Sequence, residues 1–533
     1  MRTKNLLAAL VGLGLATGCK DLNVPNLNSP ALDDLLTNPT RSKIATAATG
    51  LLIGTRAGIA AQNGYVSLLG IVGRESYNFD PADPRFVTEM MVGPLDGGSP
   101  AFGGNLWGLP YRNILNANVV LAATDRVPAV TNAEKEAVRG FAKTIEAFDL
   151  LKVIVTRDAN GAAIDVGIDL TAPPAPIVTK AAVFARIVQL LDEAQTHLQA
   201  ASATFPFPLP AGFAGFSTPG TFLQFNRALR ARAAVYTDDF AGALTALGAS
   251  FIDTTKSLNL GVYYDYSTVS GDETNALFDP NARAILAHPS FNADAQLQTS
   301  GQKDDRFLRK IDTLSAPKSA QGLTSDLQFV IYNAVDAPIP IIRNEELILL
   351  RAEANVGLNT AGSLAAAVTD LNTVRVKSGK LPVYAGAVTQ AALLDELLYN
   401  KRYSLMFEGG HRWIDLRHYS RLNTLPQDPT SGGASKRFSK FPFPGFECDA
   451  RSPAPAGCAT ASVNASRSPS TTCRAGRSAL ARASSATRKD SRSISTRRRR
   501  PSTTRAPFCT TSTARSPPSR GPAMRTWSRA TRT

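Results

Sequence analysis

Four side chains near residue 410 have types and spacings that could ligate a metal ion. They are Glu408, His411, Asp415 and His418, at intervals of three, four and three residues. On one helix these intervals would place two carboxylates and two imidazoles on one face, and such groups suit transition metals. However, residues 409–410 are Gly-Gly, which interrupts a helix inside the set. We therefore favour the alternative that no metal binds here.

Nucleophilic and hydrolytic chemistry finds little support in the chain. It contains no Gly-x-Ser-x-Gly elbow, no Walker A loop and no HExxH motif, and it has four histidines in 533 residues. The acid pairs at 304–305 and 345–346 are adjacent in sequence. Adjacent acids suit solvated or structural roles better than the two separated carboxyl groups of a glycosidase. We predict no enzyme activity, no catalytic residue and no cofactor.

Sugar binding is the chemistry for which the chain offers most candidates. Aromatic rings can cover the apolar faces of pyranose rings, while planar polar side chains bind their hydroxyls. Two segments combine these types, one around 74–86 and one at the sequence YYDY. Ordinary packing is the alternative for each residue. The predicted ligand contacts are Arg74, Tyr77, Asn78, Phe79, Tyr263, Tyr264 and Tyr266, and Phe86 and Phe102 are further loop aromatics.

Helical periodicity recurs through the body and predicts the elements that position these residues. Within 180–198, for example, Val183, Ile187, Leu190, Leu191, Ala194 and Leu198 should face inward. Long segments rich in Gly, Pro, Asn and Asp separate the helices, and we expect irregular loops at 78–104, 171–177, 203–220 and 267–336. The predicted helices are 106–124, 134–155, 180–198, 222–236, 240–247, 343–358, 363–378, 390–407 and 411–422.

The helices come in pairs, with alanines where two helices approach closely. This is typical of tetratricopeptide-type (TPR-like) repeats, although a strict 34-residue period is absent. No segment of 18 or more consecutive apolar residues occurs, so no membrane-spanning helix is predicted. The sequence therefore predicts an all-α fold in which TPR-like helix pairs form a scaffold with long irregular loops.

The net charge of +15 belongs to the end of the chain. Residues 459–533 hold 17 of the 58 basic residues and one of the 43 acidic residues, so residues 1–458 carry a formal charge of −1. A neutral body offers no electrostatic footprint for a polyanion, and we predict no nucleic-acid partner.

The amino terminus has the features of an export signal. Basic Arg2 and Lys4 precede an apolar run at 6–15, which is too short to span a bilayer, and small residues lead to Cys19. We predict a signal peptide at 1–18. Cys19 resembles the lipidated cysteine of a bacterial lipobox, although Ala16 stands where Leu is usual. We favour lipidation and a polar tether at 19–30, and the alternative is cleavage nearby with a spectator thiol.

The other four cysteines, Cys448, Cys458, Cys473 and Cys509, lie near the end of the chain. The body therefore has no disulfide framework and no CxxC metal motif. Cys448 and Cys458 could pair in an oxidising compartment, but spacing alone does not establish the bond.

Several motifs in one order resemble the RagB/SusD family. RNEELILLRAEANVGLN at 343–359 is followed by DLNTVRVKSGKLP at 370–382 and by LLDELLYNKRYSLMFEGGHRWIDLRHYSRL at 393–422. WGLPYRNILNANVVL at 107–121 and FPFPGFE at 441–447 are similar to the family's early helix and closing motif. Over 31–458 the resemblance implies a SusD-like helical domain.

The resemblance also implies a function. A SusD-like lipoprotein of the outer membrane, exposed at the surface, binds nutrient such as a glycan and caps a SusC-like TonB-dependent transporter. The alternative from another class is a TPR-like scaffold for protein assembly at the cell envelope.

The resemblance further implies a buried structural ion network. Lys401 and Ser404 stand where the family usually has Glu, and we expect these departures to weaken the network. Its members would be Arg351, Glu353, Arg375, Glu408, Arg412, Asp415 and Arg417.

Residues 459–533 match nothing in the family and are dominated by Arg, Ser, Thr, Ala and Pro. One interpretation is a disordered basic arm for anionic partners. We favour the other, a frameshift or read-through product, because all periodicity stops directly after a family-like ending.

Overall fold

The computed structural model describes residues 32–97, 102 and 105–458. The predicted signal peptide, the tether with Cys19 and the basic tail lie outside these residues. The helices of at least six residues are α2 (Leu32–Thr37), α3 (Arg41–Arg56), α4 (Tyr65–Val72), α6 (Asn105–Thr124), α7 (Asn132–Arg157), α8 (Lys180–Gln199), α9 (Pro219–Val235), α10 (Phe240–Gly248), α12 (Asp305–Lys310), α13 (Asn344–Leu358), α14 (Ala361–Lys377), α15 (Gln390–Ser404) and α16 (His411–His418).

Short helices and strands fill the connections. The short helices are α5 (Arg85–Thr88), α11 (Ser290–Asp294) and α17 (Gly445–Asp449). The strands form five two-stranded antiparallel sheets in the described residues: β1 (Ser76–Asn78) with β5 (Ile285–Ala287), β2 (Ala162–Ala163) with β3 (Ile177–Val178), β4 (Gly261–Tyr264) with β8 (Ile339–Arg343), β6 (Ile311–Ala320) with β7 (Leu323–Phe329), and β9 (Pro429–Thr430) with β10 (Gly433–Ala434).

Side-chain caps account for where several helices begin. The Thr131 hydroxyl accepts from the amide of Glu134, and the Glu134 carboxylate accepts from the amide of Thr131, which closes a capping box on α7. Thr179 and Thr389 cap α8 and α15 with one hydrogen bond each, in which the threonine hydroxyl accepts from a backbone amide of the first turn. These caps satisfy amides that the first helical turn leaves without partners.

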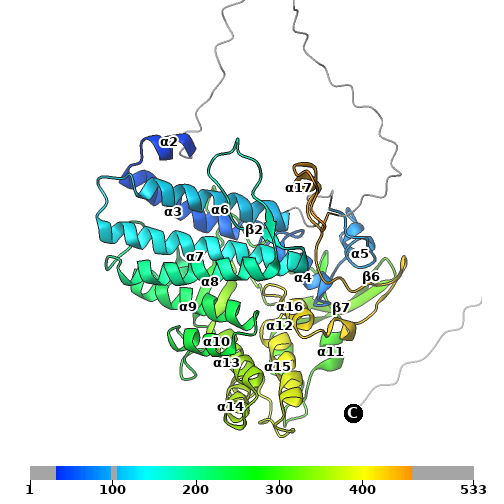
Figure 1. The fold of residues 1–533 in the computed structure, drawn as a ribbon. Coiled ribbons are helices and arrows are strands. Elements are labelled where there is room, and N and C mark those ends of the chain that lie inside the picture. The colour runs from blue at the N-terminus through cyan, green and yellow to red at the C-terminus, as the bar shows by residue number, and fades with distance from the viewer. Residues whose placement is uncertain (1–31, 98–101, 103–104, 459–533) are drawn as a thin grey trace, which may run out of the picture. The chain divides into compact units, whose positions relative to one another are not determined.

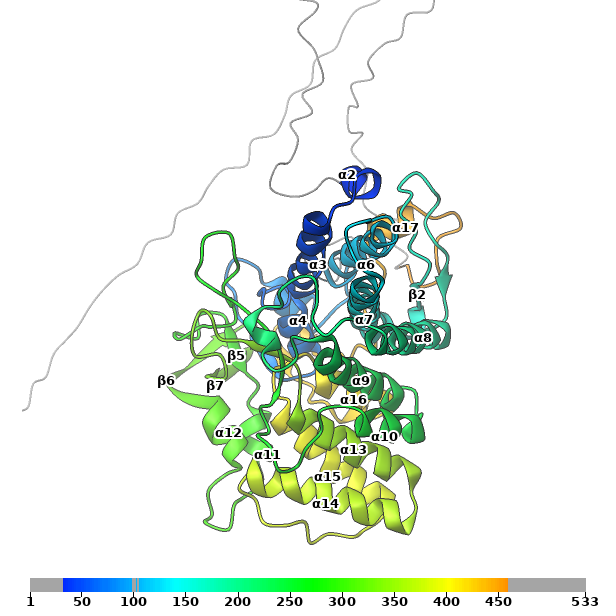
Figure 2. The same cartoon turned by 90° about the vertical axis from the view of Figure 1, so that its left-hand side faces the viewer.

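The helices pack in a succession that carries the fold. From α6 through α7, α8 and α9 to α10, each helix packs against the next; α3 joins α6 at one end, and α10 leads to α13, α14 and α15 at the other. Figures 1 and 2 show α3, α6, α7 and α8 in one half and α13–α15 in the opposite half. The predicted helical, TPR-like scaffold is confirmed, and all six residues expected to face inward from α8 are buried.

The loop predicted at 267–336 is wrong in part. This segment contains β5, α11, α12 and the hairpin of β6 and β7, which lies to the side of the helices (Figure 2). Buried and exposed positions do not alternate along β6, and its register with β7 shifts between Thr313 and Lys318. Such a strand lacks the regular apolar alternation from which a sequence pattern predicts β structure.

Lys401 is the cation between two buried acids. Its Nζ lies 2.7 Å from Glu353 of α13 and 2.6 Å from Asp415 of α16, and all three side chains are at most 3% exposed. Lys401 thus ties three helices together. The expectation that lysine at this position weakens the ion network is therefore wrong, because two acids compensate the charge.

Glu408 joins a second cluster, centred on Arg343. The Arg343 guanidinium pairs with Glu408 at 3.0 Å and with Glu345, and Lys310 lies 3.2 Å from Glu408. Ser404 is also used here, since its hydroxyl donates to Glu345 at 2.6 Å and its carbonyl accepts from both cations. Serine at this position does not break the network either.

The remaining members of the predicted network lie in separate places. Arg351 pairs with Asp370 at 2.7 Å, Arg375 pairs with Glu396, and Arg417 lies 3.4 Å from Asp158. Arg412 is buried and donates to the carbonyl of Arg74 at 3.4 Å. Six of the seven residues therefore belong to several local ion-pair clusters rather than to one network, and Arg412 donates to a backbone carbonyl instead.

A disulfide closes the end of the described chain, because Cys448 and Cys458 are bonded. The bond joins α17, which contains Cys448, to the loop that follows it. Among the described helices, none is both long and apolar enough to cross a membrane.

Replacing Lys401 by Met should destabilise the fold by about 3–5 kcal/mol, because Glu353 and Asp415 would remain buried without their cation. Denaturant unfolding of the full chain measures the difference. The control is Lys380→Met, which removes an exposed ion pair to Asp305 and should cost no more than about 1 kcal/mol. Equal losses in the two variants would contradict the role given to Lys401.

Deprotonation of Glu146 on α7 should lower the free energy of unfolding as the pH rises. The glutamate side chain is 3% exposed, and burial raises its pKa to about 7, above the usual value of about 4.3. The folded state therefore binds the proton more tightly, and this stabilisation is complete below about pH 4 and lost as the pH rises through 7. Glu146→Gln should remove about 2–3 kcal/mol of this pH dependence. Parallel stability curves for the two proteins between pH 4 and 8 would rule the assignment out.

Candidate functional site

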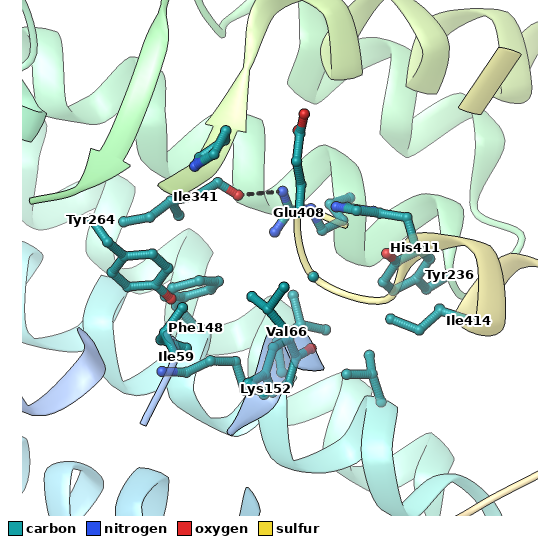
Figure 3. Close-up of a pocket in the computed structure, with 16 residues that line it drawn as sticks. Ile59, Val66, Phe148, Lys152, Tyr236, Tyr264, Ile341, Glu408, His411 and Ile414 are labelled. Carbon is teal, nitrogen blue, oxygen red and sulfur yellow. Dashed lines mark hydrogen bonds between the residues drawn. The ribbon is translucent and has the colours of Figure 1, made fainter. Parts of the chain in front are cut away.

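An interior cavity of about 40 Å³ lies where α4, α7, β4 and the segment before α16 meet. Figure 3 shows Tyr264, Phe148 and Ile59 on one side and His411, Tyr236 and Ile414 on the other, with Arg232 donating to the carbonyl of Ile341 at 2.7 Å. This volume holds only about one to three water molecules, so the cavity is too small for a sugar ring.

His411 is neutral in this cavity. Burial, reinforced by Arg232 and Lys401, lowers the pKa of its imidazole well below the usual value. The other residues of the hypothetical metal set have separate partners: Glu408 is bound to Arg343, Asp415 to Lys401, and His418 lies 3.1 Å from Asp238. Within the described chain, no group of three or more His, Cys, Asp or Glu side chains is placed to hold a metal ion.

A second cavity, of about 590 Å³, has the size of a ligand site. We call it the tyrosine cavity, because Tyr263, Tyr264 and Tyr266 line it. Its walls come from the end of α3, from the segment 210–213, from β4 and the residues that follow it, and from Ile341 of β8. The structure therefore brings together the three tyrosines of the predicted YYDY site.

The pairing of β4 with β8 positions the tyrosines. The register shifts between Val262 and Tyr263, and Tyr264 then pairs with Ile339. Gly212 allows the opposite wall to approach, since a Cβ there would lie 2.1 Å from the Tyr263 carbonyl oxygen. The Gly212 amide donates to the carboxylate of Asp265, which holds this wall against the strand.

Tyr266 has a hydroxyl without a partner. Its side chain lines the cavity and is 6% exposed, and in the described residues no hydrogen-bond partner lies near its oxygen. A buried hydroxyl left without a partner costs free energy. The Tyr266 oxygen is closed off from the cavity by neighbouring atoms, so a ligand hydroxyl could supply the missing partner only after a small shift of the side chain.

Arg56, the last residue of α3, holds the loop that covers one side of the cavity. Its guanidinium donates to the carbonyl of Asp265 and to the carboxylate of Asp272, and it lies 5.5 Å from the ring centroid of Tyr266. The loop 267–273 is also closed on itself, because the amide of Ser267 donates to the carbonyl of Glu273 at 3.0 Å. Arg56 thus connects this loop to the helical body.

Apolar side chains stand at the edge of the cavity. Ile53 of α3 lines it and is 55% exposed, and Val269, next to the lining residue Ser270, is 71% exposed. Tyr263 is half-buried beside them, and its hydroxyl donates to the carbonyl of Asn259. Exposed apolar groups beside tyrosine rings suit a ligand with both apolar faces and hydroxyls.

The other predicted ligand segment lies inside the protein. Arg74 is fully buried and lies 3.0 Å from Asp428, to which Tyr77 also donates at 2.8 Å. Asn78 is 1% exposed, and the ring of Phe79 stacks on that of Tyr77. The prediction that these four residues contact a ligand does not fit this burial, and Arg74 and Tyr77 instead bind the segment around Asp428. Phe86 and Phe102, also buried, pack edge to face.

A third cavity, of about 700 Å³, lies between the proline-rich segment 173–179 and the disulfide loop. Its lining residues include Lys440 and Arg451 but no aromatic side chain. It therefore lacks the ring surface that favours sugar binding.

Arg56 and Asp272 were missed by the sequence patterns. Asp272 lies in a segment predicted to be irregular, and no local pattern distinguishes its carboxylate from neighbouring acids. A signal for Arg56 existed: Ile44, Ala48, Leu51, Leu52 and Thr55 are buried at helical spacings that end beside it.

Comparison with known proteins shows the fold. No protein-family model matches the sequence, and no curated protein matches it. Among solved structures, a SusD superfamily protein from Bacteroides vulgatus is 15% identical, with 78% of this chain and 99% of that chain covered and a TM-score of 0.59. SusD-like carbohydrate binding proteins from Bacteroides vulgatus and Bacteroides fragilis are also 15% identical at a TM-score of 0.59; they cover 79% and 78% of this chain, and 98% of each is covered. The chain therefore has a SusD-like fold.

Replacing Arg56 by Met should release the loop 267–273, because Asp272 in the loop and Asp265 just before it each lose a hydrogen bond to a charged group. We expect amide hydrogen exchange in this loop to become about tenfold faster or more. The control is Arg126→Met, which removes one exposed hydrogen bond to the carbonyl of Leu36 and should leave the loop unchanged. Unchanged exchange in Arg56→Met would show that the loop is held in another way.

Proposed function

We propose that this protein binds glycans in the tyrosine cavity and delivers them to a SusC-like TonB-dependent transporter of the outer membrane. The observation that carries the glycan part is the combination of a SusD-like fold with a cavity of ligand size lined by three tyrosines. Two solved proteins with this fold are SusD-like carbohydrate binding proteins. No covalent step is involved, and we propose no enzyme activity.

The chemistry of the cavity supports a glycan. A pyranose ring has apolar C–H faces, which can rest against Tyr263 and Ile53, and hydroxyls at its edge. The Tyr266 hydroxyl lacks a partner and can exchange a hydrogen bond with such an edge. A purely apolar ligand would leave this hydroxyl, and part of the Arg56 guanidinium, without partners.

The amino-terminal sequence supports the proposed place of the protein at the outer membrane. A signal peptide at 1–18 and a lipid on Cys19 would export the chain and anchor it to the outer membrane. A surface-exposed anchor with a tether at 19–30 would leave the helical domain free to cap a transporter and to open and close over it.

The glycan part is tested by binding of an oligosaccharide panel to the full chain by calorimetry. Tyr266→Phe should weaken binding of the tightest ligand about fivefold to tenfold, because one hydrogen bond is lost. Tyr384→Phe is the matched control, since that tyrosine lies on the loop between α14 and α15 and donates to the carbonyl of Ala387. Equal affinities of Tyr266→Phe and wild type would remove the tyrosine cavity as the glycan site.

The transport part is tested by purifying the lipidated protein from outer membranes and identifying its partners by mass spectrometry. A stoichiometric TonB-dependent barrel is the expected partner. Recovery of soluble periplasmic proteins without a barrel would favour the TPR-like scaffold function instead. A Cys19→Ala variant should leave the membrane fraction, and its retention there would contradict the lipid anchor.

A further inference from the structure

The lining of the tyrosine cavity holds more negative than positive charges. One cation, Arg56, faces two anions, Asp265 and Asp272, so the lining carries a formal charge of −1. Glu273 follows Asp272 directly and is exposed. The Arg56 guanidinium, which is hydrogen-bonded to Asp272, holds the pKa of that carboxyl below its usual value, so it is ionised at neutral pH.

Arg56 is already committed to the chain's own acceptors. Its two terminal nitrogens donate to the Asp265 carbonyl and to the Asp272 carboxylate, and the third nitrogen, Nε, is buried without a partner in the described residues. A ligand carboxylate prefers the paired terminal nitrogens of an arginine. Each terminal nitrogen keeps a second N–H, but a ligand carboxylate that approaches them would lie next to the Asp272 carboxylate already bound there.

A neutral hydroxyl meets no such obstacle. The Tyr266 hydroxyl is buried in the lining without a partner, and it can both donate to and accept from a sugar hydroxyl. The site therefore offers hydrogen-bonding capacity for uncharged polar groups and a surplus of negative charge against anionic ones.

We infer that the tyrosine cavity selects uncharged glycans and discriminates against glycans that carry carboxylates, such as uronic acids. This inference rests on the proposed glycan binding and adds the class of sugar to it. Repulsion between like charges is stronger in a partly enclosed site than in bulk water. Salt ions still screen part of this repulsion, so the preference for uncharged glycans should be largest at low salt.

The experiment uses matched ligands that differ only in charge. The tightest neutral oligosaccharide of a mixed neutral and acidic panel is oxidised at its primary alcohols to the corresponding uronate, and both forms are titrated into the full chain. We expect the uronate to bind at least about fivefold more weakly at low ionic strength.

Asp272→Asn tests the cause of the discrimination. It removes one negative charge from the lining and replaces the ion pair to Arg56 by a neutral hydrogen bond at most, so the gap between the two ligands should close or reverse. Asp125→Asn is the matched control, because it removes an exposed aspartate that is also paired with an arginine, Arg139. The control should keep the wild-type gap.

The outcomes separate this inference from the function on which it rests. Neutral binding with a weaker uronate, and a smaller gap in Asp272→Asn, supports the inference. Equal or tighter binding of the uronate by the wild type overturns the inference and leaves glycan binding intact. A gap in affinity that Asp272→Asn does not change has the same meaning. Absence of any binding that depends on Tyr266 overturns both.

Discussion

The structure depends on two buried arginines, Arg343 and Arg232, each of which meets acidic side chains between the strands and the helices. Arg343 stands at the end of β8 and is bound to Glu345 and Glu408, while Arg232 of α9 pairs with Glu346 at 2.7 Å and donates to the Ile341 carbonyl of the same strand. An uncompensated charge at either place would cost several kcal/mol. These contacts hold β8 against the helices, and β8 in turn holds β4 with its tyrosines.

The two cavities beside this sheet differ in size and share one wall. Tyr264 and Ile341 line both, so one wall separates the interior space from the tyrosine cavity. On the interior side the groups are buried, including a neutral His411, and there is room only for water. On the other side the wall meets α3 and a loop held by Arg56, and there the volume suits a sugar ligand. A rigid interior wall thus supports a site whose outer edge is a loop.

Lys401 shows that buried ion pairs can form around a lysine at a position where the family usually has Glu. Its neighbours Glu353 and Asp415 are both acidic, so a lysine pairs with both of them where an acid would have added a third negative charge. A pattern of residue types cannot reveal this, because the compensation depends on which side chains from three helices meet. The same reason explains why the seven residues predicted as one network lie in separate places.

Much of the helical scaffold could be predicted from the sequence, because helix periodicity and caps are local. The helices at 180–198, 240–247 and 343–358 differ from α8, α10 and α13 by at most one residue at either end. The tyrosines of the YYDY cluster line a cavity, and their contact with a ligand stays a prediction. Only the tertiary structure decided that Arg74, Tyr77, Asn78 and Phe79 are buried, that β6 and β7 pair, and that Arg56 meets Asp272 across 216 residues of chain. Burial, strand pairing and long-range ion pairs depend on which distant segments meet, and a local pattern carries no information about that.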